Sequence, residues 1–125
     1  MKKVIVKNRS RQATKPIYAG YCDTFLCRFR GLMFRKNLPP NWGLLLVQAN
    51  DSRLDSAIHM IGMRFNLAII WINSLGKVVD VQPAYRWRSI ILPKTPAKFV
   101  LELSVEHLSE FKIGDEIRFE EVSSI

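Results

Sequence analysis

The sequence predicts a mainly β protein, a β-rich α+β fold made of a single compact antiparallel barrel-like domain with two short helices. Short runs rich in β-branched and aromatic residues recur along the chain, and turn residues rather than long helices separate them. The 125 residues and the apolar content of 48% fit one domain with one core. The longest apolar run, 67–72, is far shorter than the roughly 20 residues of a membrane span. Because no signal-peptide-like apolar segment follows the basic N-terminus, we expect a cytoplasmic protein without a membrane span.

The N-terminal residues predict a basic arm ahead of the domain. "KKVIVK" is a short β-branched run and is expected to form an edge strand. "PIYAGY" is expected to form the next strand, since Pro16 suits a strand start. We therefore divide the chain into a basic N-terminal arm or edge strand, residues 1–15, and a single β-rich domain, residues 16–122.

A short helix is predicted in "CDTFLCRFRGLMFR". Asp23 can cap it by accepting a hydrogen bond from a free amide of the first turn. Phe25 and Phe29 lie one turn apart, with Leu26 beside them, and are expected to form the buried face. Gly31 is expected to end the helix with positive φ, which glycine accepts without steric cost.

The centre of the chain predicts the buried part of the sheet. "GLLLVQ" reads as a buried strand, and residues 57–65 are expected to be extended. "FNLAIIWIN" is apolar on both pleat faces, which predicts a central strand covered on both sides. "NSLG" is a turn into "KVVDVQ", the expected hairpin partner.

The C-terminal third completes the predicted fold. "PAYRWRSIILPKTP" is expected to be irregular because prolines interrupt it. "KFVLELS" reads as a strand, "SVEHLSEFK" as one or two helical turns after a Ser104 cap, and "IGDEIRFEEV" as a turn and a last strand.

The net charge of +8 is unevenly distributed. Residues 1–100 carry 17 basic and 4 acidic side chains, whereas residues 101–125 carry 2 basic and 7 acidic ones. A basic arm attracts nucleic acid, anionic lipid or an acidic partner, although it also serves simply as a solvated terminus. The arm lacks the interleaved aromatic residues that stack on bases. Weak non-specific nucleic-acid binding through the arm is therefore one open hypothesis.

The two cysteines, Cys22 and Cys27, do not have the spacing of a redox or zinc motif. We expect them to be reduced thiols and not a disulfide. Cys27 and His59 have the residue types of a nucleophile and base, but nothing in the sequence brings them together.

"IHMIGMRF" combines a histidine with two methionines. His59, Met60 and Met63 are residue types that suit copper(I), but on a strand Met60 points away from the other two. Methionine also fills irregular core gaps, so packing is the favoured interpretation. Packing does not explain an imidazole. We therefore expect His59 to border a groove, with one ring nitrogen bonded inside and the other open to a ligand.

Arginines and one tryptophan are the remaining candidates for a binding site. Arg28, Arg30, Arg35 and Lys36 surround the predicted glycine turn and are either groove residues or ordinary solvated charges. Guanidinium groups match phosphate and carboxylate, and "YRWR" combines stacking with charge. The tentative ligand-binding set is His59, Arg30, Arg64, Arg86, Trp87 and Arg88.

No phosphate loop, dinucleotide fingerprint, zinc quartet or nucleophile elbow is present in the sequence. We assign no metal, no cofactor and no catalytic residue. The favoured hypothesis is a non-enzymatic binding or accessory module with a basic or aromatic groove for an anionic ligand or protein partner. A small enzyme that uses His59 is the alternative from another class.

The order of motifs resembles the family known as domain of unknown function 192. The resemblance rests on "RFRGLMFRKNLPPNWGLLLV", "IHMIGMRFNLAIIWINSLGKVV" and "AKFVLELS" followed by "FKIGDEIRF", which span most of residues 16–120. It implies a small β-rich domain and no established activity. The family pattern usually has Pro-Leu-Asp where this chain has Asn66-Leu67-Ala68, and often an aspartate at Asn73. A carboxylate-dependent function at those positions would be lost or changed here.

Overall fold

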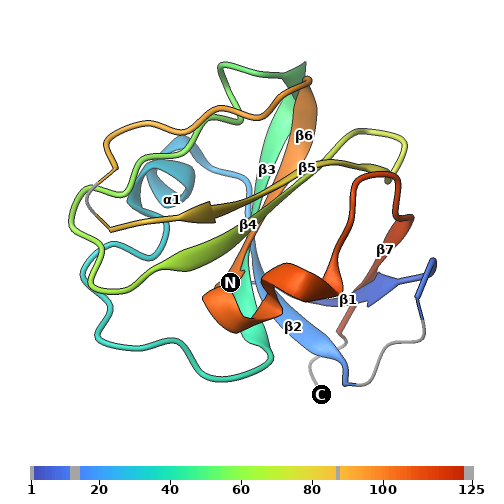
Figure 1. Ribbon diagram of the computed structural model, residues 1–125, viewed down its shortest axis with the longest axis horizontal. Helices are drawn as coiled ribbons and strands as arrows, with labels where there is room; N and C mark the ends of the chain where they lie inside the picture. The colour runs from blue at the N-terminus through green and yellow to red at the C-terminus, as the bar shows by residue number, and fades with distance from the viewer. Residues whose placement is uncertain (1, 12–14, 87, 123–125) are drawn as a thin grey trace.

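A computed structural model describes residues 2–11, 15–86 and 88–122. In these residues a seven-stranded sheet has the order β5-β4-β6-β3-β2-β1-β7, with two short helices beside it (Figure 1). The elements are β1 (Lys3–Asn8), β2 (Ile17–Cys22), α1 (Phe25–Arg30), β3 (Trp42–Ser52), β4 (Leu67–Ile72), β5 (Val78–Ala84), β6 (Ala97–Ser104), the 3-10 helix η1 (Val105–Glu110) and β7 (Ile117–Glu121). The predicted mainly β class with two short helices is confirmed. No helix in the described ranges is both long enough and apolar enough to cross a membrane.

The sheet is rolled but not closed. β2 and β3 run parallel, and the other neighbouring strands are antiparallel. The edge strands β5 and β7 meet only where they begin, where the Val78 amide donates to the Asp115 carbonyl and the Ile117 amide to the Gly76 carbonyl. The word barrel-like therefore describes the curvature of this sheet and not a continuous ring of strands.

The central strand β4 is buried on both faces, as its two-sided apolar pattern predicts. Ala68, Ile70 and Ile72 face what we call the strand-side core, which includes side chains of β1, β2 and β7. Leu67, Ile69 and Trp71 face what we call the loop-side core. This core is covered by the irregular segments 31–38 and 54–65 and by Ile91. The Trp71 indole N–H donates to the Ser56 carbonyl at 2.8 Å, which ties one of these segments to the sheet.

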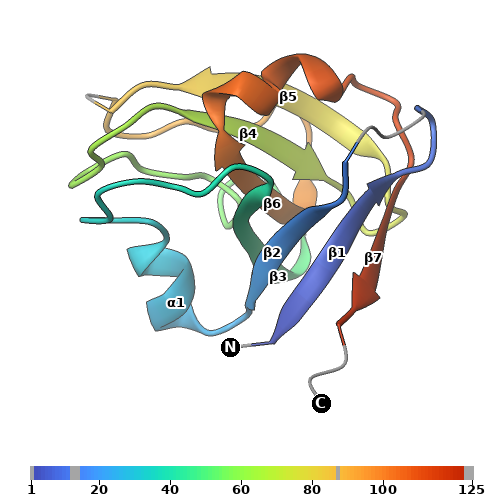
Figure 2. The same cartoon turned by 90° about the horizontal axis from the view of Figure 1, so that it is seen from below.

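β1 is a strand as predicted, but it is not an edge strand. It lies between β2 and β7, and Val6 pairs with both Ile17 and Phe119 (Figure 2). The sequence pattern was misleading because β-branched residues with flanking lysines are typical of edges, whereas here Val4 and Val6 enter the strand-side core.

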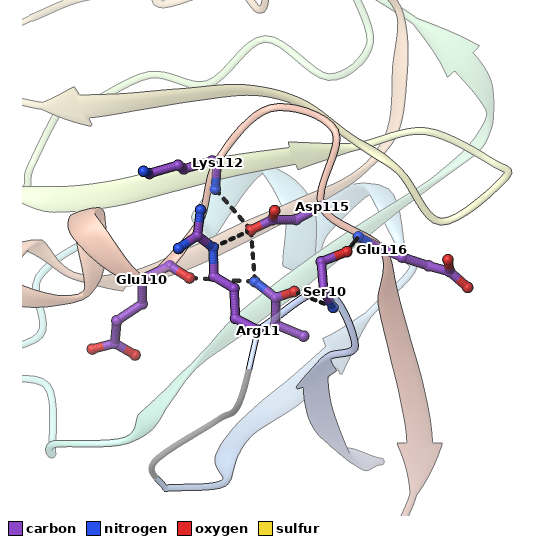
Figure 3. A network of polar contacts seen from close by, with 7 residues as sticks. Ser10, Arg11, Glu110, Lys112, Asp115 and Glu116 are labelled. Atoms are coloured by element: carbon purple, nitrogen blue, oxygen red, sulfur yellow. Dashed lines mark hydrogen bonds and ion pairs between the residues drawn. The ribbon is translucent and has the colours of Figure 1, made fainter.

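A polar network fixes the end of β1 to the turn before β7 (Figure 3). One carboxylate oxygen of Asp115 accepts hydrogen bonds from Asn8 Nδ2 at 2.8 Å, Arg11 Nε at 2.9 Å and the Lys112 amide at 2.9 Å. Ser10 Oγ accepts a further bond from the Glu116 amide at 2.8 Å. Burial alone would raise the pKa of Asp115, but these hydrogen bonds and the Arg11 charge outweigh it and lower that pKa below its ordinary value.

Helix α1 differs from its prediction in two respects. Its N-cap is Thr24 and not Asp23, because the Thr24 hydroxyl accepts from the Cys27 amide at 3.2 Å. Phe25, Leu26 and Phe29 were expected to be buried, yet all three are exposed and no residue of the helix is buried. A helix of six residues covers little of the sheet, so the apolar spacing did not decide which face was buried.

The cysteine prediction is wrong. Cys22 and Cys27 form a disulfide, with their α-carbons 5.7 Å apart. Cys22 ends β2 and α1 starts three residues later, so the first helical turn brings Cys27 back over the strand end. A spacing of five matches no metal or redox motif. That mismatch does not exclude a disulfide, because a strand-to-helix reversal also brings two cysteines together.

Residues 57–65 are not a strand. Only Ile58 makes a bridge, to Ile91, and the chain then turns at Gly62, which has φ of +75°. Met60 and Met63 are both buried in the loop-side core, so the packing interpretation of the methionines is confirmed. The other predicted strands and the helical turns after Ser104 are present, but the Ser104 side chain makes no capping hydrogen bond.

We predict that Asp115→Asn lowers the free energy of unfolding at pH 7 by about 1–3 kcal/mol, the range for a buried group with charge-assisted partners. Because the pKa of Asp115 is lowered on folding, its contribution is present above the ordinary value of 3.8 and is lost as the pH falls through the folded value. Urea unfolding at several pH values should therefore show a difference that shrinks in acid. Glu116→Gln, a neighbouring exposed change, is the control, and equal losses in both variants would contradict the prediction.

We predict that Gly31→Ala destabilises the protein by about 1–3 kcal/mol, because Gly31 combines φ of +49° with ψ of −127°, a conformation that strains any residue with a Cβ. The prediction of positive φ at this helix end is confirmed, although ψ lies outside the left-handed helical region. Thermal or urea unfolding measures the effect. Lys36→Ala in the following exposed loop is the control, and an unchanged midpoint for Gly31→Ala would refute the strain.

Candidate functional site

A cavity of about 420 Å³ lies under helix α1. Its walls come from α1, from the end of β3 around Gln48 and from the irregular segment that contains Leu54 and His59. The exposed rings of Phe25 and Phe29 border it. A volume of this size is within the range of about 300–1,000 Å³ that small-molecule sites occupy.

Glu102 is the most unusual residue of the cavity. It lies on β6, directly between Leu44 of β3 and Ile69 of β4, and is only 5% exposed. Its side chain makes no hydrogen bond or ion pair within the described part of the chain, and burial raises its pKa from 4.5 to about 7. A carboxyl group of this kind is close to half-protonated at neutral pH and both donates and accepts hydrogen bonds.

The glycine at the end of α1 lies against this carboxyl group. A Cβ on Gly31 would lie 3.4 Å from Oε1 of Glu102. The helix therefore ends beside the Glu102 carboxyl group with a residue that has no side chain. This leaves Glu102 in contact with the cavity, where an added side chain would crowd it.

His59 borders the same cavity. Its Nε2 lies 2.8 Å from the Phe29 carbonyl oxygen, and its ring centroid lies 5.1 Å from that of Phe29. Because a carbonyl only accepts, Nε2 must carry the hydrogen, which makes Nδ1 of the neutral ring an acceptor. Nδ1 is buried without a partner among the described residues. The imidazole is thus bonded through one nitrogen only.

The arginines of the sequence-based set do not converge. Arg28 and Arg30 both line the cavity, and Arg28 Nη1 donates to the carbonyl oxygens of Asp23 at 2.6 Å and Val47 at 3.2 Å. Arg64, Arg86 and Arg88 are exposed and are not among its lining residues. Trp87 lies outside the described residues. Of the five described members of the expected set, the cavity therefore brings together His59 and Arg30.

The basic N-terminal segment is partly neutralised. Lys7 forms an ion pair with Glu120 at 3.0 Å, and Arg11 forms one with Asp115 at 2.9 Å. Acidic residues of the C-terminal segment thus lie beside Lys7 of β1 and Arg11, which follows β1. Within residues 2–11, 15–86 and 88–122, no cluster of three or more His, Cys, Asp and Glu side chains has the arrangement of a metal site.

Sequence reasoning missed Glu102 and Gln48. The available signal was a single carboxylate inside "KFVLELS", on the same face as Val100, in a strand that otherwise reads as buried. A charged residue is rarely buried without a partner, so a carboxylate in a strand with this pattern indicates a candidate site residue. Asn73, by contrast, has a structural role, since its side-chain oxygen accepts from the amides of Leu75 and Lys77 in the β4–β5 turn.

Solved structures show the same fold. A Sinorhizobium meliloti protein described as a "putative transcription regulator" superposes with a TM-score of 0.81 and 20% identity, covering 94% of this chain and 92% of its own. A protein of unknown function from Novosphingobium aromaticivorans gives 0.78 and 20%, covering 93% and 83%.

Sequence relatives give the family. A Pyrococcus furiosus UPF0127 protein is 35% identical over 82% of this chain and 87% of its own. A Thermococcus gammatolerans UPF0127 protein is 44% identical over 64% of this chain. The match spans 50% of the length of that relative, and the match to a Thermococcus sibiricus UPF0127 protein spans 63% of that relative's length. The family model DUF192, described as "Uncharacterized ACR, COG1430", matches residues 5–119. The chain therefore belongs to the DUF192 family, as the order of its motifs predicted.

Proposed function

We propose that this protein is a binding module that holds a small amphipathic ligand, with an anionic group at one end, in the cavity under α1. The observation that carries the proposal is the buried carboxyl group of Glu102, which has no partner in the described chain and faces a cavity of about 420 Å³. An unpaired polar group in a core costs free energy, so a bound ligand that supplies the missing hydrogen bond would relieve that cost.

The charges of the cavity give the ligand an orientation. An anionic group next to Glu102 would be repelled whenever that carboxyl group is ionised. At the rim, Arg30 is exposed and Arg28 keeps guanidinium nitrogens other than Nη1 for a carboxylate or phosphate. The anionic end therefore belongs at the rim, between the guanidinium groups.

The rest of the ligand would lie against apolar and neutral polar groups. Phe25, Phe29 and Leu54 offer apolar surface at the cavity wall. At the floor, Glu102 and the buried amide of Gln48 offer donors and acceptors to an uncharged polar group such as a hydroxyl or an amide. An apolar body with polar groups at both ends matches this arrangement.

A second candidate is an enzyme in which Glu102, and not His59 alone, transfers a proton. A pKa of about 7 is suited to a general acid or base at neutral pH, and His59, whose buried Nδ1 has no partner among the described residues, borders the same cavity. Cys27 offers no free thiol as nucleophile, because it is bonded to Cys22. The binding module is favoured, since no serine, threonine or cysteine is among the described residues that line the cavity.

The proposal is tested by titrating the ¹⁵N-labelled protein with phenylacetate and with its neutral counterpart phenylacetamide. We expect phenylacetate to shift the amide signals of residues 28–33 and 57–59 in saturable fashion, and phenylacetamide to bind more weakly because it lacks the charge that guanidinium groups recognise. Arg30→Gln should weaken the preference for the anion, with Arg28 retaining part of it. Arg118→Gln, an exposed change on β7, is the matched control. Signals that do not respond at this cavity, or a preference that Arg30→Gln leaves undiminished, would refute the assignment.

A stability measurement tests the state of Glu102 independently of any ligand. Because its pKa rises on folding from 4.5 to about 7, the folded state binds the proton more tightly, and stability falls as the pH rises through this interval. The total loss is at most about 3 kcal/mol, and Glu102→Gln removes it. The variant should thus be more stable than the wild type at pH 8 and lose that advantage near pH 5. Glu106→Gln is the exposed control, and parallel pH profiles of wild type and Glu102→Gln would contradict the raised pKa.

A further inference from the structure

We propose that the end of the molecule around α1 docks onto the surface of an anionic lipid membrane. We call this region the α1 end and define it as the described residues of segments 23–36, 53–66 and 85–92. Both views of the ribbon place these segments at one end, opposite the C-terminal end of β1 and the β4–β5 turn (Figures 1 and 2). Phe25, Phe29 and Leu54 border the cavity as well, so the proposal is tested at residues of the α1 end that do not line the cavity.

The α1 end carries most of the exposed large apolar side chains. Nine of the thirteen in the described chain belong to it. Leu26 is 73% exposed, Ile61 62% and Leu54 77%. These nine are Phe25, Leu26, Phe29, Phe34, Leu54, Ile61, Tyr85, Ile90 and Leu92. Single exposed apolar residues are ordinary, whereas a gathering of this kind marks an interaction surface.

Contacts hold the three segments together as one surface. The Phe34 amide donates to the Gly62 carbonyl at 3.0 Å, which joins the loop after α1 to the turn at Ile61. The Met60 amide donates to the Arg88 carbonyl at 3.2 Å, which joins that turn to segment 85–92. Apolar residues that are far apart in the sequence therefore lie beside one another.

The same surface is strongly basic. Segments 23–36, 53–66 and 85–92 contain eight basic residues and only two acidic ones, Asp23 and Asp55. Arg64 and Arg86 are exposed, and their guanidinium groups bond to no other described residue. Apolar side chains that enter the interface and arginines that face the headgroups are the two components of peripheral binding to anionic membranes.

Other occupants fit this surface less well. A second copy would bring two basic surfaces together, which like-charge repulsion opposes. Nucleic acid would engage the arginines but leaves exposed leucine and isoleucine without a function, because bases stack on aromatic rings. A rigid protein partner would need separate pockets for the exposed rings and the leucine of α1, whereas a fluid lipid interface accommodates Phe25, Leu26 and Phe29 without them.

Co-sedimentation with vesicles tests the proposal. We expect the protein to pellet with phosphatidylcholine vesicles that contain phosphatidylserine, and to remain largely in solution with pure phosphatidylcholine. Arg64→Glu with Arg86→Glu should weaken the partition at least about tenfold, because each surface arginine contributes roughly 1 kcal/mol. Leu26→Ser with Ile61→Ser should weaken it by a similar factor through loss of apolar insertion. Neither pair lines the cavity under α1, so failure here leaves the cavity proposal unaffected.

Matched controls lie at the opposite end of the molecule. Arg9→Glu and Leu75→Ser make the same chemical changes at exposed sites and should leave the partition unchanged. Equal binding to neutral and anionic vesicles, or equal losses in the control variants, would overturn the proposal. A parallel measurement with duplex DNA covers the competing occupant. Binding of DNA that depends on Arg64 and Arg86 but not on Leu26 and Ile61, without vesicle binding, would make this a polyanion surface instead.

Discussion

The pairing of β6 with both β3 and β4 is the interaction on which the rest of the structure depends. These three strands separate the strand-side core from the loop-side core, so their side chains are buried on both faces. Such positions accept apolar residues almost without exception. Gln48 of β3 and Glu102 of β6 are buried polar exceptions, and Glu102 makes no hydrogen bond or ion pair with the described residues. An unpaired buried carboxyl group lowers stability at neutral pH. Its presence therefore favours a functional role for Glu102 over a structural one.

Helix α1 is attached to the rest of the molecule without burial of its large apolar side chains. Apolar packing does not hold the helix, since none of its residues is buried. It is held instead by the disulfide to β2, by Arg28 on the Val47 carbonyl and by His59 on the Phe29 carbonyl. These attachments leave the apolar side chains of the helix unused by the core. Phe25 and Phe29 are therefore available to line the cavity, and Leu26 to project from the surface.

Strand positions were predictable from the sequence, because alternating apolar residues indicate strands and turn residues indicate where the strands end. The pattern of 65–73 gave both the location of β4 and the burial of its two faces. The neighbour relations were less accessible, since β1 as an interior strand depends on residues more than 100 positions away. The candidate site was predicted only in part. His59 and Arg30 were identified from residue type, whereas Glu102 needed the knowledge that β6 is central and that α1 ends over it. The disulfide and the exposed helix depend on a chain reversal that local spacing does not encode.

The position of β1 also has a consequence for how the chain acquires its structure. β1 pairs with β7 over almost the whole length of the chain, with Val4 opposite Glu121, and Asp115 then joins the two ends through Asn8 and Arg11. Contacts of such long sequence separation carry a large loop-closure entropy and slow the search for the native topology. During synthesis, β1 and β2 emerge before β7, so one edge of β1 stays unpaired until β7 leaves the ribosome. An open strand edge attracts other extended chains, so the nascent protein is most vulnerable to aggregation in that interval.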